Sequence, residues 1–333
     1  MAAYKTLKGQ SIKKVAQDPA NPIIGQIWYN TTIGSLKVYK TVNGTWASGG
    51  ARSTSRSLSG GAGTQTAGLS FGGYDGPNFT TVKNTEEYNG TSWTNGGDIN
   101  SPAGLDSAAG SGSQTAALSA SGKSGGPPSY TYPTITNSFE YDGSSWTGGG
   151  AVSNGRTVAG SAGTQTASLL FGGQSQSNKT EEYNGSSWTN GGNLPQGINR
   201  PGGTGTQTAA IQMGGHTDPP ADFNVTNYYD GSSWTAQPGT MNTARNSLGS
   251  SGTQTNCVAY GGYKYSYPSG GTAATELWDG TSWTTTTSMA TAGPTSQSPS
   301  GGDSSLALAV FGNTTVEEWT GPIVTTRNVT TTS

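Results

Sequence analysis

The chain has 333 residues, 54 of them glycine, and only 10% of the residues are charged, which leaves a formal net charge of −2 at pH 7. This balance provides no basic field for a phosphate backbone, so nucleic-acid binding is not expected. No apolar run approaches the about 20 residues of a membrane span, and residues 1–10 lack the apolar core of a secretory signal, so we expect a soluble protein without membrane insertion or export by the usual leader.

Residues 1–48 are expected to form a separate arm, an attachment module built on short β-hairpins. Four lysines make the start of this arm basic, which suits either an acidic partner or a solvated flexible terminus: Lys5, Lys8, Lys13 and Lys14. The arm contains four short segments of the kind found in hairpins: Asp18-Pro19-Ala20-Asn21-Pro22, residues 25–32, Leu36-Lys37-Val38-Tyr39 and Gly44-Thr45-Trp46.

From residue 49 onward one phrase returns at intervals of 42 to 51 residues. It consists of a glutamine among Thr and Ser, a short apolar run, an acidic-aromatic step and a tryptophan. The anchor glutamines are Gln65, Gln114, Gln165, Gln207 and Gln254, and a degenerate sixth copy begins near Gly301-Gly302-Asp303. A period of this size is typical of β-propeller blades, and no stretch has a helical stripe.

Turn residues divide each copy into short strands. Residues 67–71 and 86–88 of the first copy are predicted strands. Gly-Gly pairs end the earlier strand, as at Gly72-Gly73. An Asn-Gly or Asp-Gly pair, such as Asn89-Gly90, follows the later one and predicts a tight hairpin with a type I′ turn. Each copy therefore predicts four strands.

These marks resemble the kelch repeat, in which Gly-Gly closes the second strand and a Tyr and a Trp follow a few residues apart. The aromatic pairs are Tyr88/Trp93, Tyr141/Trp146, Tyr183/Trp188, Tyr229/Trp234 and Trp278/Trp283. The resemblance covers roughly residues 50–320 and implies an all-β, kelch-like β-propeller with four-stranded blades. The second copy departs from it with Ser121-Gly122, and the sixth with Gly312-Asn313.

The number of blades depends on one surplus strand. First and second strands occur six times, whereas the aromatic third strand occurs seven times if Tyr39 is counted with Trp319. Either residues 36–46 close the last blade, or residues 322–331 supply that strand. We favour six blades, with seven as the alternative, and a division into an arm of residues 1–48 and a propeller of residues 49–333.

The hairpin phrases of the arm resemble the start of structural proteins of tailed bacteriophages, especially marine ones, in which similar segments precede kelch-like repeats. The segment from Val316 to Gly321, followed by a Thr/Val tail, resembles the end of the same group. The resemblance implies a virion protein, in a tail fibre, appendage or capsid decoration, that is assembled in the host cytoplasm and contacts other virion proteins through its arm. Identical arms often assemble around a symmetry axis, so we expect a homo-oligomer.

Ligand binding is expected on the face that carries the loops between second and third strands, because these loops vary in length and carry aromatic residues. The aromatic candidates are Tyr74, Tyr130, Tyr132, Phe223, Tyr263, Tyr265 and Tyr267. Packing of the loops on one another is the alternative. The same face should receive Arg56, Arg156, Arg200 and Arg245. These arginines would either ring a channel mouth and hold an acidic sugar, or bond carbonyl groups of neighbouring blades.

Catalysis, cofactors and metal ions are not expected. Consecutive glutamates such as Glu86 and Glu87 recur at one position of the repeat and point to opposite faces of a strand, which indicates a scaffold role. Kelch-type copper oxidases use two histidines and a Tyr–Cys link, whereas His216 is the only histidine here, and its loop position favours a solvated side chain. Cys257 lies in a column of small residues and is expected to be a buried thiol.

The leading hypothesis is a non-enzymatic virion structural protein whose loop face binds a host-surface glycan or receptor, or another virion protein. A sialidase-like glycoside-processing enzyme is the first alternative, and it would need three convergent arginines, a Tyr nucleophile and an acid. The sequence offers Arg and Tyr candidates for such a site but no isolated acid. The second alternative is an intracellular kelch interaction adaptor, against which the phage-like amino terminus argues.

Overall fold

The computed structural model describes residues 12–101, 103–126, 131–174, 177–217, 221–266, 269–295 and 303–329. Across these ranges the regular structure consists of β-strands, with no helix. Two compact units are formed: a larger one, Thr45–Thr320, and a smaller one that combines Met1–Gly44 with Gly321–Ser333. The expected all-β class is confirmed.

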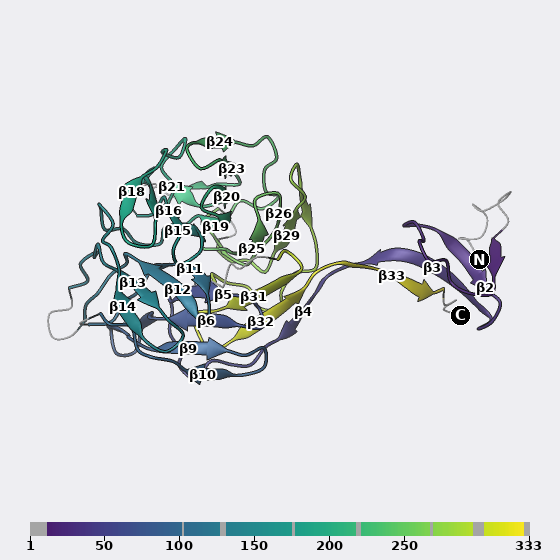
Figure 1. Cartoon of the computed structure of the whole chain (residues 1–333), viewed down its shortest axis with the longest axis horizontal. Coiled ribbons are helices and arrows are strands. Elements are labelled where there is room, and N and C mark those ends of the chain that lie inside the picture. Colours follow the sequence, from purple (N-terminus) through teal and green to yellow (C-terminus); the bar gives the residue numbers. More distant parts are fainter. Residues whose placement is uncertain are drawn as a thin grey trace. The chain divides into compact units, whose positions relative to one another are not determined.

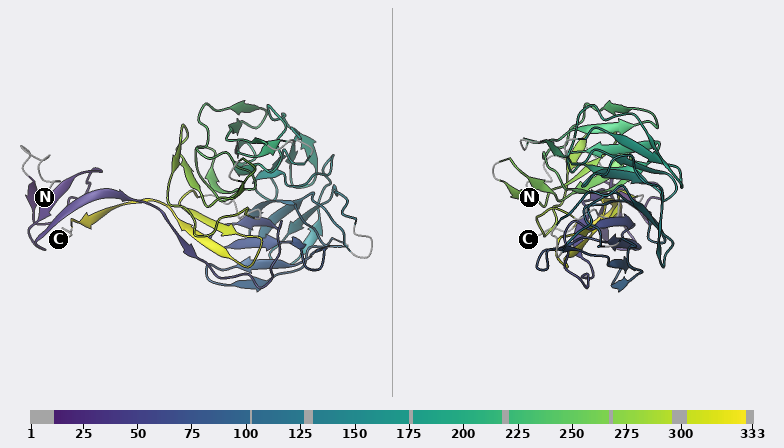
Figure 2. Two further views of the ribbon diagram at one scale, coloured as in Figure 1. Left: turned by 180° about the vertical axis from the view of Figure 1, so that it is seen from behind. Right: turned by 90° about the vertical axis from the view of Figure 1, so that its left-hand side faces the viewer.

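The smaller unit is a single four-stranded sheet. Its strands are β1 (Lys13–Val15), β2 (Ile27–Asn30), β3 (Ser35–Val42) and β33 (Ile323–Asn328), in that order across the sheet. β1 is parallel to β2, and the other neighbours are antiparallel. Figure 2 shows the yellow strand β33 lying along the purple strand β3. The two ends of the chain therefore share one sheet.

Asp18 fastens this sheet. Its Oδ1 accepts hydrogen bonds from Trp28 Nε1 at 2.9 Å and from Asn30 Nδ2 at 2.8 Å. Its Oδ2 accepts a hydrogen bond from Lys37 Nζ at 2.6 Å. These bonds, that from Lys37 above all, lower the pKa of Asp18 to about 2. The Asp-Pro phrase thus begins with a carboxylate that joins β2 to β3.

The larger unit contains five four-stranded antiparallel sheets that follow one another along the chain. Sheet 1 consists of β5 (Gly60–Gly63), β6 (Gly68–Phe71), β9 (Thr85–Tyr88) and β10 (Trp93–Asn95). Sheet 2 consists of β11 (Ala109–Ser113), β12 (Ala116–Ala120), β13 (Ser138–Tyr141) and β14 (Trp146–Gly148). Sheet 3 consists of β15 (Gly160–Gly163), β16 (Ser168–Phe171), β17 (Thr180–Tyr183) and β18 (Trp188–Asn190). Sheet 4 consists of β19 (Gly202–Thr206), β20 (Ala209–Met213), β23 (Thr226–Tyr229) and β24 (Trp234–Ala236). Sheet 5 consists of β25 (Gly249–Thr253), β26 (Asn256–Tyr260), β29 (Thr275–Trp278) and β30 (Trp283–Thr285).

The sheets are arranged like the blades of a propeller. The first strands of successive sheets contact one another, from β5 to β11 and onward to β25 and β31. Figure 1 shows these first strands toward the middle of the larger unit, and the fourth strands β10, β14, β18 and β24 at its edge. The strands expected at residues 67–71 and 86–88 are confirmed as β6 and β9.

Sheet 6 draws its strands from both ends of the larger unit. In the described part of the chain it consists of β31 (Leu306–Val310), β32 (Val316–Thr320) and β4 (Thr45–Ser48), and β32 pairs with both of the others. Residues 301 and 302, where the sixth copy was expected to begin, lie outside the described ranges. Trp46 Nε1 in β4 donates to Thr275 Oγ1 of sheet 5 at 2.9 Å. Trp146 in the fourth strand of sheet 2 makes the same bond to Thr85 of sheet 1.

The division of the chain therefore differs from the expected boundary after residue 48. Residues 45–48 belong to the larger unit because their backbone completes the edge of sheet 6 and Trp46 packs against Tyr260 and Trp319. Of the two candidates for the surplus strand, the segment that ends at Trp46 pairs with β32. The C-terminal candidate instead forms β33, which pairs with β3.

The anchor glutamines join neighbouring sheets. Gln114 Nε2, at the first hairpin of sheet 2, donates to the carbonyl oxygens of Gly68 and Tyr88 in sheet 1, at 3.0 and 2.7 Å. Gln165, Gln207 and Gln254 make the same pair of bonds to the sheet before them. Gln65 of sheet 1 donates to the carbonyl oxygen of Trp319 in sheet 6 at 2.7 Å. The recurrent Gln thus bonds main-chain carbonyl groups across each of these boundaries between sheets.

Third-strand tyrosines form a second set of bonds between sheets. Tyr141 Oη of sheet 2 donates to Glu87 of sheet 1, and Tyr88 Oη of sheet 1 donates to Glu318 of sheet 6. Burial and the bond to Glu318 raise the pKa of Tyr88 to about 12, so the phenol keeps its proton as the donor. Glu87 therefore has a structural partner, as expected for the scaffold glutamates.

The hairpins at the Asn-Gly and Asp-Gly pairs are tight, but the predicted type I′ turn is wrong. Tyr88 pairs directly with Trp93, so the loop has four residues, and Gly90 has a positive φ of 88° whereas Asn89 does not. The Asn89 side chain explains the difference, because its Oδ1 accepts hydrogen bonds from the backbone N–H groups of Thr91 and Ser92. This Asx turn is an alternative use of the same residue pair.

The Gly-Gly pairs end the second strands as predicted. Gly72 and Gly73 have φ angles of 60° and 120°, and Ser121 in the second copy adopts the same left-handed conformation at 58°. Ser121 Oγ donates to the Ile135 carbonyl at 2.8 Å, a local bond that a glycine could not make. Three two-stranded ribbons follow these pairs: β7 (Tyr74–Asp75) with β8 (Thr80–Thr81), β21 (His216–Thr217) with β22 (Ala221–Asp222), and β27 (Tyr263–Lys264) with β28 (Gly270–Gly271).

Candidate functional site

A cavity of about 440 Å³, which we call the loop-end cavity, lies where the loops after the Gly-Gly pairs meet the starts of the first strands. Its lining comes from the repeats that build sheets 1 to 5. The lining residues are Leu58, Tyr74, Asp106, Ser107, Lys123, Tyr132, Thr157, Val158, Gln174, Asn199, Arg200, His216 and Tyr265. Four of them, Tyr74, Tyr132, Arg200 and Tyr265, are candidates predicted from the sequence.

Backbone pairing brings the two kinds of segment together. Bridges join Ser57 to Tyr74, Asp106 to Lys123 and Asn199 to His216. In each pair the first residue precedes a first strand and the second follows the glycine turn. The two segments therefore lie at the same end of each sheet, as the sequence predicts.

Left-handed residues form a collar between this cavity and a second one. The φ angles of five non-glycine residues at one position of the repeat lie between 50° and 55°: Leu58, Ser107, Val158, Arg200 and Ser247. Such conformations cost about 1–3 kcal/mol each. In this conformation the backbone N–H of Ser107 donates to the Leu58 carbonyl oxygen at 2.8 Å. The N–H of Val158 donates in the same way to the Ser107 carbonyl oxygen at 2.9 Å. The second cavity, of about 150 Å³, shares Leu58, Ser107, Val158 and Arg200 with the first.

Aromatic rings border the loop-end cavity. Tyr74 and Tyr132 meet edge to face with their ring centroids 5.9 Å apart. Tyr265 is 40% exposed, and its ring lies 5.0 Å from that of His216. Tyr263 packs on Tyr265 at 5.2 Å. Of the other predicted aromatic candidates, Phe223 is half-buried away from the lining, whereas Tyr130 and Tyr267 lie outside the described residues.

Three of the four predicted arginines are internal structural groups. Arg56 is 1% exposed, and its Nη1 lies 2.8 Å from Glu86 Oε2. Arg156 pairs with Glu181, and Arg245 pairs with Glu276 at 3.2 Å. Each glutamate also accepts hydrogen bonds from the loop before its arginine, as Glu86 does from the Ser53 N–H at 3.0 Å. The expectation of four arginines around the mouth therefore applies to Arg200 alone, because the other guanidinium groups are used inside the sheets.

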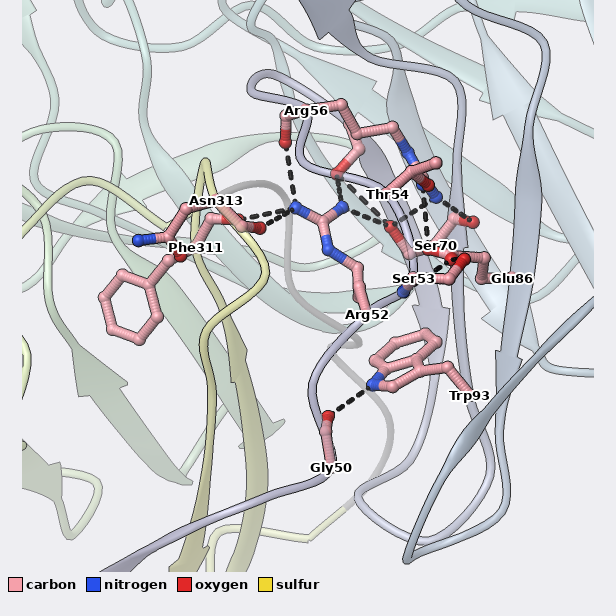
Figure 3. A network of polar contacts seen from close by, with 11 residues as sticks. Gly50, Arg52, Ser53, Thr54, Arg56, Ser70, Glu86, Trp93, Phe311 and Asn313 are labelled. Carbon is pink, nitrogen blue, oxygen red and sulfur yellow. Dashed lines mark hydrogen bonds and ion pairs between the residues drawn. The ribbon is translucent and has the colours of Figure 1, made fainter.

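Sequence reasoning missed Arg52, which joins the first and last sheets. Its Nη2 donates to the carbonyl oxygens of Phe311 and Asn313 at 2.6 and 2.7 Å, and to that of Arg56 at 2.8 Å. Figure 3 shows its guanidinium between these carbonyl groups and the Arg56–Glu86 pair. Burial lowers the pKa of Arg52 to about 9. The carbonyl contacts compensate for the removal of this cation from water.

Asp106 is the acidic group of the loop-end cavity. It is 4% exposed, and its Oδ1 has no hydrogen-bond partner within the described protein. Burial raises the pKa of this carboxyl, against the opposing influence of a Ser107 hydrogen bond and the Lys123 charge. Buried carboxylate oxygens are almost always bonded, so the Oδ1 of this lining residue is an acceptor that lacks its usual donor.

His216 corrects one expectation and Cys257 confirms another. The His216 side chain is 5% exposed rather than solvated, because its loop folds back over the strand starts and Tyr265 covers the ring. Its Nδ1 lies 3.1 Å from the Thr217 carbonyl oxygen. Cys257 is fully buried in β26, and burial raises the pKa of its thiol.

Six polar lining residues were not singled out from the sequence: Asp106, Ser107, Lys123, Thr157, Gln174 and Asn199. Their positions in the repeat are nevertheless regular. Asp106, Thr157 and Asn199 lie eight residues before an anchor glutamine, Ser107 lies seven before, and Lys123 and Gln174 directly follow a glycine turn. Aligning the copies at these positions would have found the site.

Over the described ranges, no group of three or more His, Cys, Asp and Glu residues could hold a metal ion. The same ranges contain no helix long and apolar enough to cross a membrane.

No protein-family model matches the chain. A search of curated proteins likewise gives no match.

Proposed function

We propose that this chain is a non-enzymatic binding protein in which six sheets close into a kelch-like propeller and the loop-end cavity holds a sugar of a host-surface glycan. The observation that carries the proposal is the lining of the cavity, where Tyr74, Tyr132 and Tyr265 border a set of buried polar groups. Aromatic rings offer flat apolar area to the C–H faces of a sugar, and the polar groups can bond its hydroxyls. The volume of about 440 Å³ is in the range of small-molecule sites.

Ring closure is supported by contacts between the first and last sheets. Gln65 and Tyr88 of sheet 1 donate to Trp319 and Glu318 of sheet 6, and Arg52 bonds Phe311. The bonds of Gln65 and Tyr88 are of the same kind as those that the equivalent Gln and Tyr residues make between the other neighbouring sheets. A closed ring leaves only the short outer strand of each sheet as an edge, and it holds the loops of five repeats around one cavity.

Binding without catalysis agrees with how the charged groups are used. A glycoside hydrolase needs two carboxyl groups beside the bond that is cleaved, and Asp106 is the one acid among the described lining residues. A sialidase-like site needs three convergent arginines, but Arg56, Arg156 and Arg245 are paired with glutamates inside the sheets. An adaptor that binds an intracellular protein is the remaining alternative, and the volume of the cavity, which is that of a small-molecule site, favours a small ring over a protein surface.

Attachment to a virus particle is the second part of the proposal. It is supported by the resemblance of residues 18–46 to the start of phage structural proteins, and by the separate sheet that Met1–Gly44 forms with Gly321–Ser333. We propose that this smaller unit contacts other virion proteins, directly or as part of a homo-oligomer. Immunogold microscopy of particles from the source culture, with antibody against residues 50–320, should label a tail, fibre or shell. Free protein in the lysate with unlabelled particles would contradict attachment.

The binding proposal is tested by an array of immobilised sugars probed with the purified chain. We expect selective binding to a small group of sugars, and loss of that binding in Tyr265→Ser. Phe79→Ser is the matched control, because Phe79 is a 58% exposed aromatic residue outside the cavity lining. Binding to no sugar, or equal loss in both variants, would overturn the proposal.

A further inference from the structure

In the described part of the larger unit, the buried Arg–Glu ion pairs belong to the odd-numbered sheets. Before sheets 1, 3 and 5, the residue nine positions ahead of the anchor glutamine is an arginine that pairs with a third-strand glutamate: Arg56–Glu86, Arg156–Glu181 and Arg245–Glu276. Leu105 and Ile198 replace the arginine before sheets 2 and 4, and Phe139 and Asn227 replace the glutamate. The interior of these two repeats therefore holds no such ion pair.

The charges that line the loop-end cavity come from those same two repeats. Asp106 and Lys123 belong to the second repeat, and Arg200 belongs to the fourth. The equivalent positions in the other three repeats carry uncharged residues: Ser57, Thr157 and Asn246 for Asp106; Tyr74, Gln174 and Tyr263 for Lys123; Leu58, Val158 and Ser247 for Arg200. Because the uncharged versions build the same collar, the fold does not need these charges.

Arg200 has no carboxylate partner within 4.0 Å among the described residues, unlike the three internal arginines. Its Nη1 reaches only Ser247 Oγ, at 3.5 Å, and the residue is half-buried in the lining. Its backbone lies in the left-handed region, at a φ of 51°. A guanidinium held in this way keeps its two parallel N–H donors available for an anion.

Asp106 offers the complementary group. Its Oδ1 is an acceptor in the lining without a protein donor. Lys123 lies opposite Asp106 in an isolated β-bridge. Its positive charge counteracts the rise in the pKa of Asp106, although no ion pair within 4.0 Å joins the two side chains. With Asp106 and Lys123 offsetting each other, the charge of Arg200 remains unbalanced.

We infer that the loop-end cavity selects a sugar that carries one carboxylate, with Arg200 binding the carboxylate and Asp106 accepting a hydroxyl hydrogen bond. This inference rests on the proposed function and adds the chemical class of the ligand. Neutral sugars can bond Asp106 and stack on the tyrosines, but they leave Arg200 without its anion. A charge-assisted bond contributes enough to change affinity about tenfold or more.

The test compares matched acidic and neutral sugars on the full chain by titration calorimetry. The probes are glucuronic acid against glucose, and sialyllactose against lactose. In at least one pair the acidic member should bind about tenfold more tightly. Arg200→Gln should remove this preference, because the acidic member loses its charge-assisted bond and then binds about as tightly as the neutral member. Arg327→Gln, which alters an exposed arginine of β33 in the smaller unit, is the control and should keep the preference.

The outcomes separate the two claims. Equal affinity for acidic and neutral members, or a preference that survives in Arg200→Gln, overturns the inference and leaves the proposed function standing. Binding of no sugar in the calorimeter or on the array overturns both. Thermal unfolding of each variant, monitored by circular dichroism, shows whether the chain is folded, and Arg200→Lys provides a second variant that keeps the charge but loses bidentate geometry. We expect Arg200→Lys to retain only part of the preference.

Discussion

The side-chain amide of Gln65 donates a 2.7 Å hydrogen bond to the carbonyl oxygen of Trp319, 254 residues later in the chain. This bond places the first anchor glutamine on the last sheet, just as each later glutamine lies on the sheet before it. The sequence repeat therefore has its physical meaning at the boundaries between sheets.

Replacing Gln65 by alanine should lower the free energy of unfolding by about 1–3 kcal/mol, because the buried Trp319 carbonyl loses its donor. Urea denaturation followed by tryptophan fluorescence measures this change. Gln196→Ala is the control, since Gln196 is exposed, and it should be neutral within about 0.5 kcal/mol. An equally small effect of Gln65→Ala would argue against a structural role of the bond between sheets 1 and 6.

Two truncated chains test whether β4 belongs to sheet 6. A chain of residues 45–320 should fold, whereas residues 49–320 should be less stable by about 3 kcal/mol or more, because Trp46 and a paired strand are lost. Differential scanning calorimetry compares the two. Equal melting temperatures would show that residues 45–48 contribute nothing to the larger unit.

The buried Arg56–Glu86 pair predicts strong non-additivity. Glu86→Ala should destabilise the protein by about 3–5 kcal/mol, because it leaves the Arg56 guanidinium buried without its counter-ion. The double change Arg56→Leu with Glu86→Phe copies the residues that sheet 2 carries at Leu105 and Phe139, and it should cost much less than the single change. Chemical denaturation of the single and double variants gives the coupling energy. Additive losses would contradict this role of the pair.

Sequence reasoning succeeded where spacing alone carries the information. The period of the glutamines and the Tyr/Trp pairs predicts the sheets, and the loops after the Gly-Gly pairs lie, as expected, at the same end as the starts of the first strands. The role of Arg56 could not be predicted, because it depends on Glu86, which lies 30 residues away and meets it only in the folded sheet. The assignment of β4 to the larger unit and of β33 to the smaller unit could not be predicted either, because it depends on which strands they pair with in the folded chain. The turn type predicted at Asn89-Gly90 was wrong because the same dipeptide occurs in both a type I′ turn and an Asx turn.

Asp106→Asn should stabilise the protein, because it removes a carboxyl whose Oδ1 lacks a donor; sheets 4 and 5 carry asparagine at this position. The folded-state pKa of Asp106 is raised, so its destabilising contribution is absent below the unfolded pKa of about 3.9, grows as the pH rises from there to the folded value, and is complete above it. We expect a gain of about 1–2 kcal/mol at pH 7 that shrinks toward pH 3. Urea titrations at both pH values provide the measurement, and a gain that does not change with pH would refute the assignment.

Asp18 predicts the opposite pH dependence in the smaller unit. Its folded-state pKa is lowered to about 2, so its stabilising hydrogen bonds are complete above the unfolded pKa of about 3.9 and disappear as the pH falls toward 2. The protection factors of the β2 and β3 amides, which correct for the intrinsic exchange rate at each pH, should therefore fall over this range. In Asp18→Asn this fall should be absent, and its persistence there would assign the acid sensitivity to another group.

Hydrogen exchange with bound sugar tests the central claim most directly. With the tightest-binding sugar of the array, amides near Tyr74, Lys123, Asn199 and His216 should exchange more slowly, whereas those of the hairpin at residues 89–92 should not change. Such protection would place the ligand in the loop-end cavity. Protection confined to the hairpin end of the sheets, or the absence of any bound sugar, would contradict the account.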